Sequence, residues 1–279
     1  MYAGLAINWC VKLGKYFVSC SAMKWLFFFL CISTVGFGQT LKLANKTSLD
    51  ADEFIGVDSF KHVYYIKNGT LHKKGELGTF QFQDFQLGPL TSVDIINPLN
   101  VVLFYEQTNT VVFLDNRLNE KERIEFNELP SFLNLSMASN AGNNRLWVFN
   151  SDTQQLELYQ YRTQLQTTVS QPLKGVVQSY ASNFNDCTLL SEDKIRKINI
   201  YGSLLQEIPS EGMERLVKHN EMLLGIKEQQ LYKIEQGTIQ PIPFDFGEIP
   251  LEDLQLTQDF LYIYHAKMLY AYSLTQPKQ

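Results

Sequence analysis

The hydrophobic pattern of the chain is built on a short unit, which is plainest between Asp253 and Leu274. An alternating apolar run from Leu261 to Tyr264 is followed by a tight turn and by a second alternating run from Leu269 to Leu274. Two such runs separated by a few polar residues predict a β-hairpin. A further strand-like run, Leu254 to Thr257, precedes the hairpin. The unit therefore has at least three consecutive strands.

The same unit recurs upstream, so that the chain contains six copies. In unit one we predict strands at Phe54 to Val57, Val63 to Ile66 and from Thr70, and a fourth strand at Phe80 and Phe82; in unit two at Val93 to Ile96, Val101 to Tyr105 and Val111 to Leu114; in unit three at Met137, Leu146 to Phe149 and Leu156 to Tyr161; in unit four at Val176 to Ala181, Cys187 to Leu190 and Ile195 to Ile200; and in unit five at Arg215 to Lys218, Met222 to Ile226 and Leu231 to Ile234.

The spacing of the units supports a true repeat. Taken at the first or second residue of each middle strand, the separations are 39, 44, 41, 36 and 38 residues, between Val63, Val102, Leu146, Cys187, Leu223 and Leu261. A period of about 40 residues is typical of four-stranded propeller blades. The residue before each central turn is apolar and the next is polar, as expected where a strand leaves the core.

An isolated strand, Leu41 to Ala44, precedes the first unit, whereas the last unit has only three strands. If this strand completes the last unit, it closes the ring and removes an open sheet edge. Phe113, Leu114 and Asp115 form an apolar-apolar-Asp strand end common in propellers. The chain thus resembles the secreted six-bladed β-propellers, over residues 41–274. We predict an all-β, six-bladed β-propeller closed by an N-terminal strand, with a two-sheet β-sandwich as the alternative.

The first 38 residues have a different composition from the rest of the chain. They contain three lysines and no acidic residue, and an apolar block extends from Trp25 to Phe37. Gly36 and Gly38 supply small side chains before Gln39, so this segment has the pattern of a secretory signal peptide. Met23, followed by Lys24, would by itself open a normal signal peptide, so we interpret residues 1–22 as an upstream extension, with an unusually long cationic start as the alternative. We predict a signal peptide over 1–38, a propeller domain over 39–279, and a periplasmic or extracellular location.

Cleavage after residue 38 leaves 21 basic and 29 acidic side chains and one cysteine, Cys187. An acidic surface repels phosphate backbones, so nucleic acid is not expected as a partner. A mature chain with one cysteine has no internal disulfide, and we interpret Cys187 as a buried core residue. We expect a monomer that does not span a membrane after cleavage.

Candidate chemistry is sparse. The histidines, His62, His72, His219 and His265, show no spacing typical of a metal pair, and no nucleophile motif surrounds Cys187. Polar residues recur at equivalent turns (Asp58, Asn97, Asn140, Asn183 and Asp259), where they suit either tight turns or a ring of Ca²⁺ ligands. The turn interpretation is preferred. We therefore predict no catalytic residues, no metal ligands and no cofactor.

The segments that lead into blades two, three and six are the most informative. They mix aromatic residues and prolines with acidic residues, and in a propeller they share one face with the central hairpin turns. Rigid apolar groups ringed by polar ones are typical of a docking surface. The predicted partner-binding residues are Phe85, Leu87, Pro89, Pro130, Phe132, Phe244, Phe246, Glu248 and His265. The alternative is that these side chains fill the contacts between blades.

Two functions follow from this pattern. The first is an exported, non-enzymatic binding or assembly module of the cell envelope that docks a protein or peptide on that face. The second is a metal-dependent propeller hydrolase, lactonase or lyase with its metal in the central channel.

Overall fold

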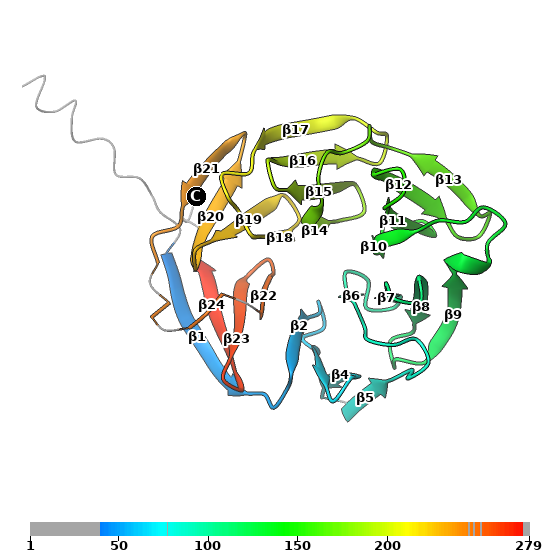
Figure 1. Cartoon of the computed structure of the whole chain (residues 1–279). Helices are drawn as coiled ribbons and strands as arrows, with labels where there is room; N and C mark the ends of the chain where they lie inside the picture. Colours follow the sequence, from blue (N-terminus) through cyan, green and yellow to red (C-terminus); the bar gives the residue numbers. More distant parts are fainter. Residues whose placement is uncertain (1–39, 77, 245, 248, 252, 276–279) are drawn as a thin grey trace, which may run out of the picture. The chain divides into compact units, whose positions relative to one another are not determined.

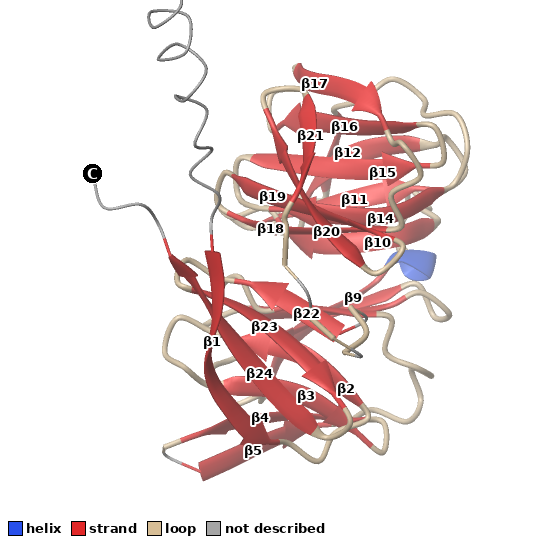
Figure 2. Ribbon diagram, turned by 90° about the vertical axis from the view of Figure 1, so that its left-hand side faces the viewer, coloured by secondary structure: helices blue, strands red, loops and turns tan. Residues whose placement is uncertain are grey.

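The computed structural model describes residues 40–76, 78–244, 246–247, 249–251 and 253–275. The predicted signal peptide lies outside these residues. Figure 1 shows strands grouped into sheets around a central opening, and Figure 2 shows the ring from the side. In the described part of the chain the remaining regular element is a 3-10 turn, η1 (Phe126–Glu128), and no helix is long and apolar enough to cross a membrane.

Each sheet has four antiparallel strands and forms one blade. Blade one contains β2 (Glu53–Val57), β3 (Val63–Lys67), β4 (Thr70–Gly75) and β5 (Gly78–Phe82); blade two β6 (Ser92–Asp94), β7 (Val101–Tyr105), β8 (Thr110–Leu114) and β9 (Glu120–Glu125); blade three β10 (Leu135–Asn140), β11 (Arg145–Asn150), β12 (Gln155–Gln160) and β13 (Leu165–Thr168); blade four β14 (Val177–Ser182), β15 (Asp186–Ser191), β16 (Lys194–Asn199) and β17 (Leu204–Pro209); blade five β18 (Arg215–His219), β19 (Met222–Lys227), β20 (Gln230–Glu235) and β21 (Thr238–Pro241); and blade six β22 (Asp253–Leu256), β23 (Phe260–His265), β24 (Met268–Thr275) and β1 (Thr40–Ser48).

The two ends of the ring meet in blade six. β1 pairs antiparallel with β24, from Thr40 opposite Thr275 to Ser48 opposite Met268, with one bulge after Leu43. The strand predicted at Leu41 to Ala44 is thus confirmed, and it is longer than its apolar pattern indicated. The six-bladed propeller is confirmed, and the two-sheet sandwich is excluded because the sheets form a ring.

The hydrophobic core is divided among the contacts between neighbouring blades. The described residues form six buried clusters, and each joins two adjacent blades. Trp147 of blade three, for example, is fully buried in a cluster with Leu189 of blade four. Cys187 lies in the same cluster, is fully buried, and has a pKa raised by burial. Its interpretation as a core residue is confirmed.

The outer strands of blades two to five are the elements that the hydrophobic pattern missed. β9, β13, β17 and β21 have exposed positions interspersed with half-buried ones. An outer strand is the last strand of its sheet. One of its backbone edges faces solvent, and the other pairs only with the third strand of the blade. Such strands need few buried apolar side chains, so their sequences lack the regular apolar alternation of the inner strands.

The recurring polar turn residues bond to their own turns. The side-chain oxygens of Asn97, Asn140 and Asn183 accept backbone N–H groups two residues on, at 3.1, 2.9 and 2.8 Å. Asp58 does the same for Phe60 at 2.9 Å. In blade six the hydroxyl of Thr257, rather than the predicted Asp259, accepts the backbone N–H of the turn. The turn interpretation therefore holds for four of the five positions.

Candidate binding face

The segments that connect one blade to the next, named linkers here, lie against the central turns between second and third strands. The backbone N–H of Leu49 donates to Lys267 O at 2.9 Å, and that of Leu173 donates to Gln154 O at 2.7 Å. Each bond joins a linker to the central turn of the blade that it leaves. Linkers and central turns therefore form one surface, the linker face, as predicted.

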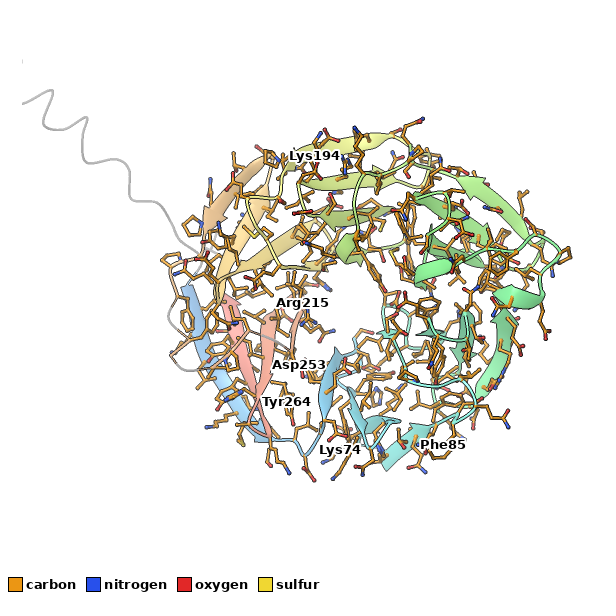
Figure 3. The ribbon with its side chains drawn as sticks, viewed as in Figure 1. Lys74, Phe85, Lys194, Arg215, Asp253 and Tyr264 are labelled. Atoms are coloured by element: carbon orange, nitrogen blue, oxygen red, sulfur yellow. The ribbon has the colours of Figure 1, made fainter. Side chains whose placement is uncertain are left out.

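Four of the predicted partner-binding residues are exposed on this face. Phe85 is 83% exposed and Phe132 is 56% exposed, and Pro89 and Pro130 are also exposed. Phe85 belongs to the linker that enters blade two and is seen at the outer rim in Figure 3. Phe132 and Pro130 belong to the next linker. Two neighbouring linkers thus each present an aromatic ring and a proline to solvent.

Other predicted residues are part of the core or its walls. Leu87 is 6% exposed and packs in the cluster between blades one and two. Phe246 is 9% exposed, and its ring lies 5.5 Å from that of Tyr272 and 4.6 Å from that of the half-buried Phe244. Leu87 and Phe246 therefore fill contacts between blades, which is the alternative given above, and are not exposed. His265, which ends β23, is half-buried, and Glu248 lies outside the described residues.

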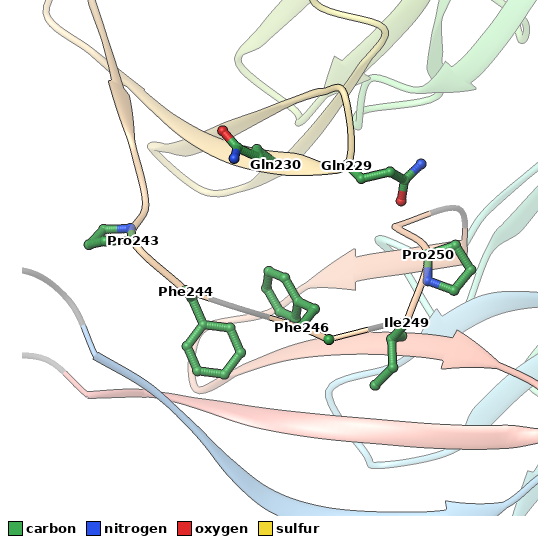
Figure 4. Close-up of a pocket in the computed structure, with 8 residues that line it drawn as sticks. Gln229, Gln230, Pro243, Phe244, Phe246, Ile249 and Pro250 are labelled. Carbon is green, nitrogen blue, oxygen red and sulfur yellow. The ribbon is translucent and has the colours of Figure 1, made fainter.

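A groove of about 710 Å³ opens where the linker between blades five and six passes the central turn of blade five (Figure 4). It is lined by Gln229, Gln230, Pro243, Phe244, Phe246, Gly247, Ile249 and Pro250. The Gln229 Oε1 atom accepts the backbone N–H of Leu251 at 2.7 Å, which ties the two walls together. An apolar wall bordered by amide side chains suits an apolar side chain of a polypeptide.

Three charged residues lie where innermost strands begin, at the ends of the linkers. Glu53, Arg215 and Asp253 are the first residues of the innermost strands β2, β18 and β22. Arg215 and Asp253 lie beside the central opening in Figure 3. The Asp253 carboxylate accepts the Phe54 backbone N–H at 3.3 Å. Sequence reasoning missed this group, although the three residues occupy equivalent positions in blades one, five and six.

The position of Glu53 has a pH-dependent consequence. Although the Glu53 side chain reaches solvent, the surrounding protein restricts its hydration. This restriction, together with repulsion by Asp253, raises the pKa of Glu53, and Arg215 offsets part of the effect. A raised pKa in the folded state means that ionising Glu53 lowers the stability of the fold. This loss is complete above the folded-state pKa, and it disappears as the pH falls to the unfolded-state pKa.

We expect Glu53→Gln to raise the melting temperature at pH 7, with a gain that fades as the pH is lowered toward 4.5, the ordinary value of the group. Thermal unfolding followed by circular dichroism across this range measures the effect. In an Asp253→Asn background the gain should be smaller, because one repelling charge is gone. A gain that is constant with pH, or a loss at pH 7, would contradict this assignment.

The histidines occupy separate places. The Nδ1 atom of His62 lies 3.0 Å from the Asp58 carboxylate, and the His72 ring stacks on Tyr65 with ring centres 5.0 Å apart. Burial lowers the pKa of both His72 and His219. Within the described residues no three His, Cys, Asp or Glu side chains come together in a way that could hold a metal ion.

No family model matches the chain, and no curated protein matches it. Its fold is similar to that of virginiamycin B lyase from Staphylococcus aureus, with a TM-score of 0.60 and 12% identity over 85% of this chain and 100% of that one. A streptogramin B lyase gives a TM-score of 0.57 and 13% identity over 79% of this chain and 78% of that one. The WD40 domain of Neurospora crassa Pan2 gives a TM-score of 0.54 and 8% identity over 81% of this chain and 76% of that one.

Identities of 8 to 13% show a shared fold and nothing about activity. Together with the strand order, they place the chain in the class of β-propellers. The described residues form a six-bladed ring whose last blade is closed by its N-terminal strand.

Proposed function

We propose that the protein is an exported binding or assembly module of the cell envelope, which docks a protein or peptide partner on its linker face. The export part rests on the signal-peptide pattern of residues 1–38. The docking part rests on the way in which the linker before blade two presents Phe85 to solvent.

The linker that carries Phe85 is held in place by contacts on both sides of this residue. Asp84 accepts the backbone N–H of Gln86 at 2.9 Å and a hydrogen bond from the Arg123 guanidinium at 2.9 Å. On the other side, Leu87 is buried and its carbonyl accepts the Thr108 hydroxyl at 3.1 Å. An aromatic side chain on an already ordered backbone loses little freedom when it binds. Aromatic residues, phenylalanine included, are enriched at protein interfaces.

Phe132 is presented in a similar way. The next residue, Leu133, is 3% exposed, and its carbonyl accepts the Asn109 side-chain amide at 2.6 Å. Exposed Pro130 stiffens the linker two residues earlier. Phe85 and Phe132 thus provide two preformed apolar contacts on neighbouring linkers, and the groove between blades five and six offers a pocket for a partner side chain on the same face.

The decisive variant is Phe85→Ser/Phe132→Ser. Because truncating an interface hot spot costs about 2 kcal/mol or more, the double variant should lose capture of a partner from an envelope extract. Its melting temperature should change little, because both rings are exposed. Affinity capture with the tagged mature protein, followed by mass spectrometry of the bound fraction, provides the measurement.

Phe60→Ser is the matched control. Phe60 is 62% exposed, and it lies in the turn between the first and second strands of blade one, on the opposite face of the ring. This variant should capture the partner as the unmodified protein does. If the double variant still captures it, or if Phe60→Ser loses it, the linker face is not the docking surface.

A further inference from the structure

A polar cavity of about 280 Å³ lies between blades four and five. Its walls are formed by Thr188, Lys197, Gln206, Lys218, Glu221, Leu223, Ile234, Glu235 and Gln236. The volume is just below the range of about 300–1,000 Å³ that is usual for small-molecule sites, so a ligand here would be small. The cavity is separate from the groove between blades five and six.

Strand register brings the polar side chains of blade four together. Thr188 of β15 is paired with Lys197 of β16, and Lys197 is paired with Gln206 of β17, directly beside a bulge. Paired residues lie side by side on one face of a sheet, so these three form a row. The opposing row in blade five is Lys218, Leu223 and Ile234.

Three other blades fill the corresponding position with apolar side chains. Val102 of blade two, Trp147 of blade three and Leu224 of blade five are at most 1% exposed, and each packs in the cluster shared with the next blade. Thr188 is far smaller than Trp147 and carries a hydroxyl. Thr188 thus places a polar group on the cavity wall where these three blades have an apolar side chain.

Two buried polar atoms that line the cavity have no hydrogen-bond partner among the described residues. They are the Thr188 hydroxyl oxygen, in a residue that is 1% exposed, and the Gln206 side-chain nitrogen. Burying a polar group without a partner is unfavourable. The amide nitrogen can only donate and the hydroxyl can donate, so a ligand that offers oxygen acceptors would satisfy both.

Two lysines, Lys197 and Lys218, line the cavity, and both are paired with acidic side chains. Lys218 is paired with Asp186, and both side chains are almost fully buried. Lys197 lies 3.7 Å from Asp186 and 2.8 Å from Glu221. The Glu221 side chain is 79% exposed, so its pair with Lys197 is weak and exchangeable. The remaining acid on the wall, Glu235, pairs with Lys233 at 2.6 Å.

We propose that the cavity between blades four and five binds a small organic carboxylate. The Thr188 hydroxyl and the Gln206 amide donate to the ligand oxygens, and Lys197 supplies the positive charge after Glu221 swings into solvent. A ligand-binding site inside the ring is independent of docking on the linker face.

Titration calorimetry with sodium acetate, propionate and succinate, at constant ionic strength set with sodium chloride, tests the proposal. At least one carboxylate should bind saturably, and glycerol should not. Thr188→Val and Gln206→Leu should each weaken binding about tenfold or more, because a hydrogen bond to a charged group is lost. Thr167→Val and Gln240→Leu make the same changes at exposed positions of outer strands and should bind as the unmodified protein does.

The melting temperature separates a ligand site from a structural one. Thr188→Val should not lower it, because the hydroxyl has no partner to lose. Equal binding of glycerol, the absence of saturable heat with every carboxylate, or unchanged binding by Thr188→Val would each overturn the proposal.

Discussion

Deletion of residues 39–48 should cause the protein to aggregate or to melt far below the intact mature chain. These residues include the whole of β1, which pairs with β24 along its length. Each backbone hydrogen bond contributes only about 0.5–1.5 kcal/mol, but several are lost together. Leu41, which is 6% exposed in the cluster between blades five and six, is lost with them. Against a total stability of about 5–15 kcal/mol, this loss is severe.

The deletion also leaves β24 as an open sheet edge, which favours aggregation. Thermal unfolding and size-exclusion chromatography measure both effects. Two point variants serve as a graded control, because Leu41→Ala removes a buried side chain, whereas Leu43→Ala removes one that is 47% exposed. The first should cost about 2 kcal/mol or more and the second much less. A deletion variant that melts within a degree or two of the intact chain would refute ring closure by β1.

Asp58→Ala should produce the second largest loss of stability. The Asp58 side chain is fully buried, and its carboxylate accepts the Tyr64 hydroxyl at 3.1 Å and the His62 backbone N–H at 2.9 Å. It also lies 3.6 Å from the Lys73 ammonium, whose side chain is only 3% exposed. Removing the carboxylate leaves a buried cation whose remaining hydrogen bond is to the Asn116 carbonyl. Breaking a buried ion pair in this way costs about 3–5 kcal/mol.

In a domain of this size each kcal/mol lowers the melting temperature by roughly 2–4 °C, so calorimetry resolves the effect easily. Asp58→Ala/Lys73→Met should recover part of the loss, because the unpaired charge is gone. Asp50→Ala removes an exposed carboxylate that pairs with Lys67 and Lys267, and it should change little. A double variant no more stable than Asp58→Ala would show that the buried charge is not the cause.

The fold was predictable because apolar alternation marks the inner strands of each blade. The leftover strand at Leu41 to Ala44 predicted closure correctly, since a last unit with three strands requires a fourth. The missed outer strands range from one dominated by charge, Glu120–Glu125, to the partly apolar Leu204–Pro209, and none of them shows the regular alternation of the inner strands. An outer strand is placed by its backbone pairing with the third strand, and the hydrophobic pattern of the sequence does not reveal that pairing.

The candidate site was predictable only in part. Phe85, Leu87 and Phe246 are all large apolar residues on linkers, yet the first is exposed and the other two are buried. Packing between blades decides this difference, and it depends on residues far away in the sequence, such as Tyr272 against Phe246. The cavity between blades four and five depends in the same way on the register of three strands around Thr188, which no local motif reveals.

Amide hydrogen exchange of the protein alone and saturated with its captured partner tests docking on the linker face most directly. Peptides that cover residues 83–91 and 129–134, around Phe85 and Phe132, should exchange more slowly in the complex. The turns at 58–62, 96–100 and 183–185, on the opposite face, should be unchanged. Protection confined to those turns, with the two linkers unaffected, would contradict the proposed docking surface.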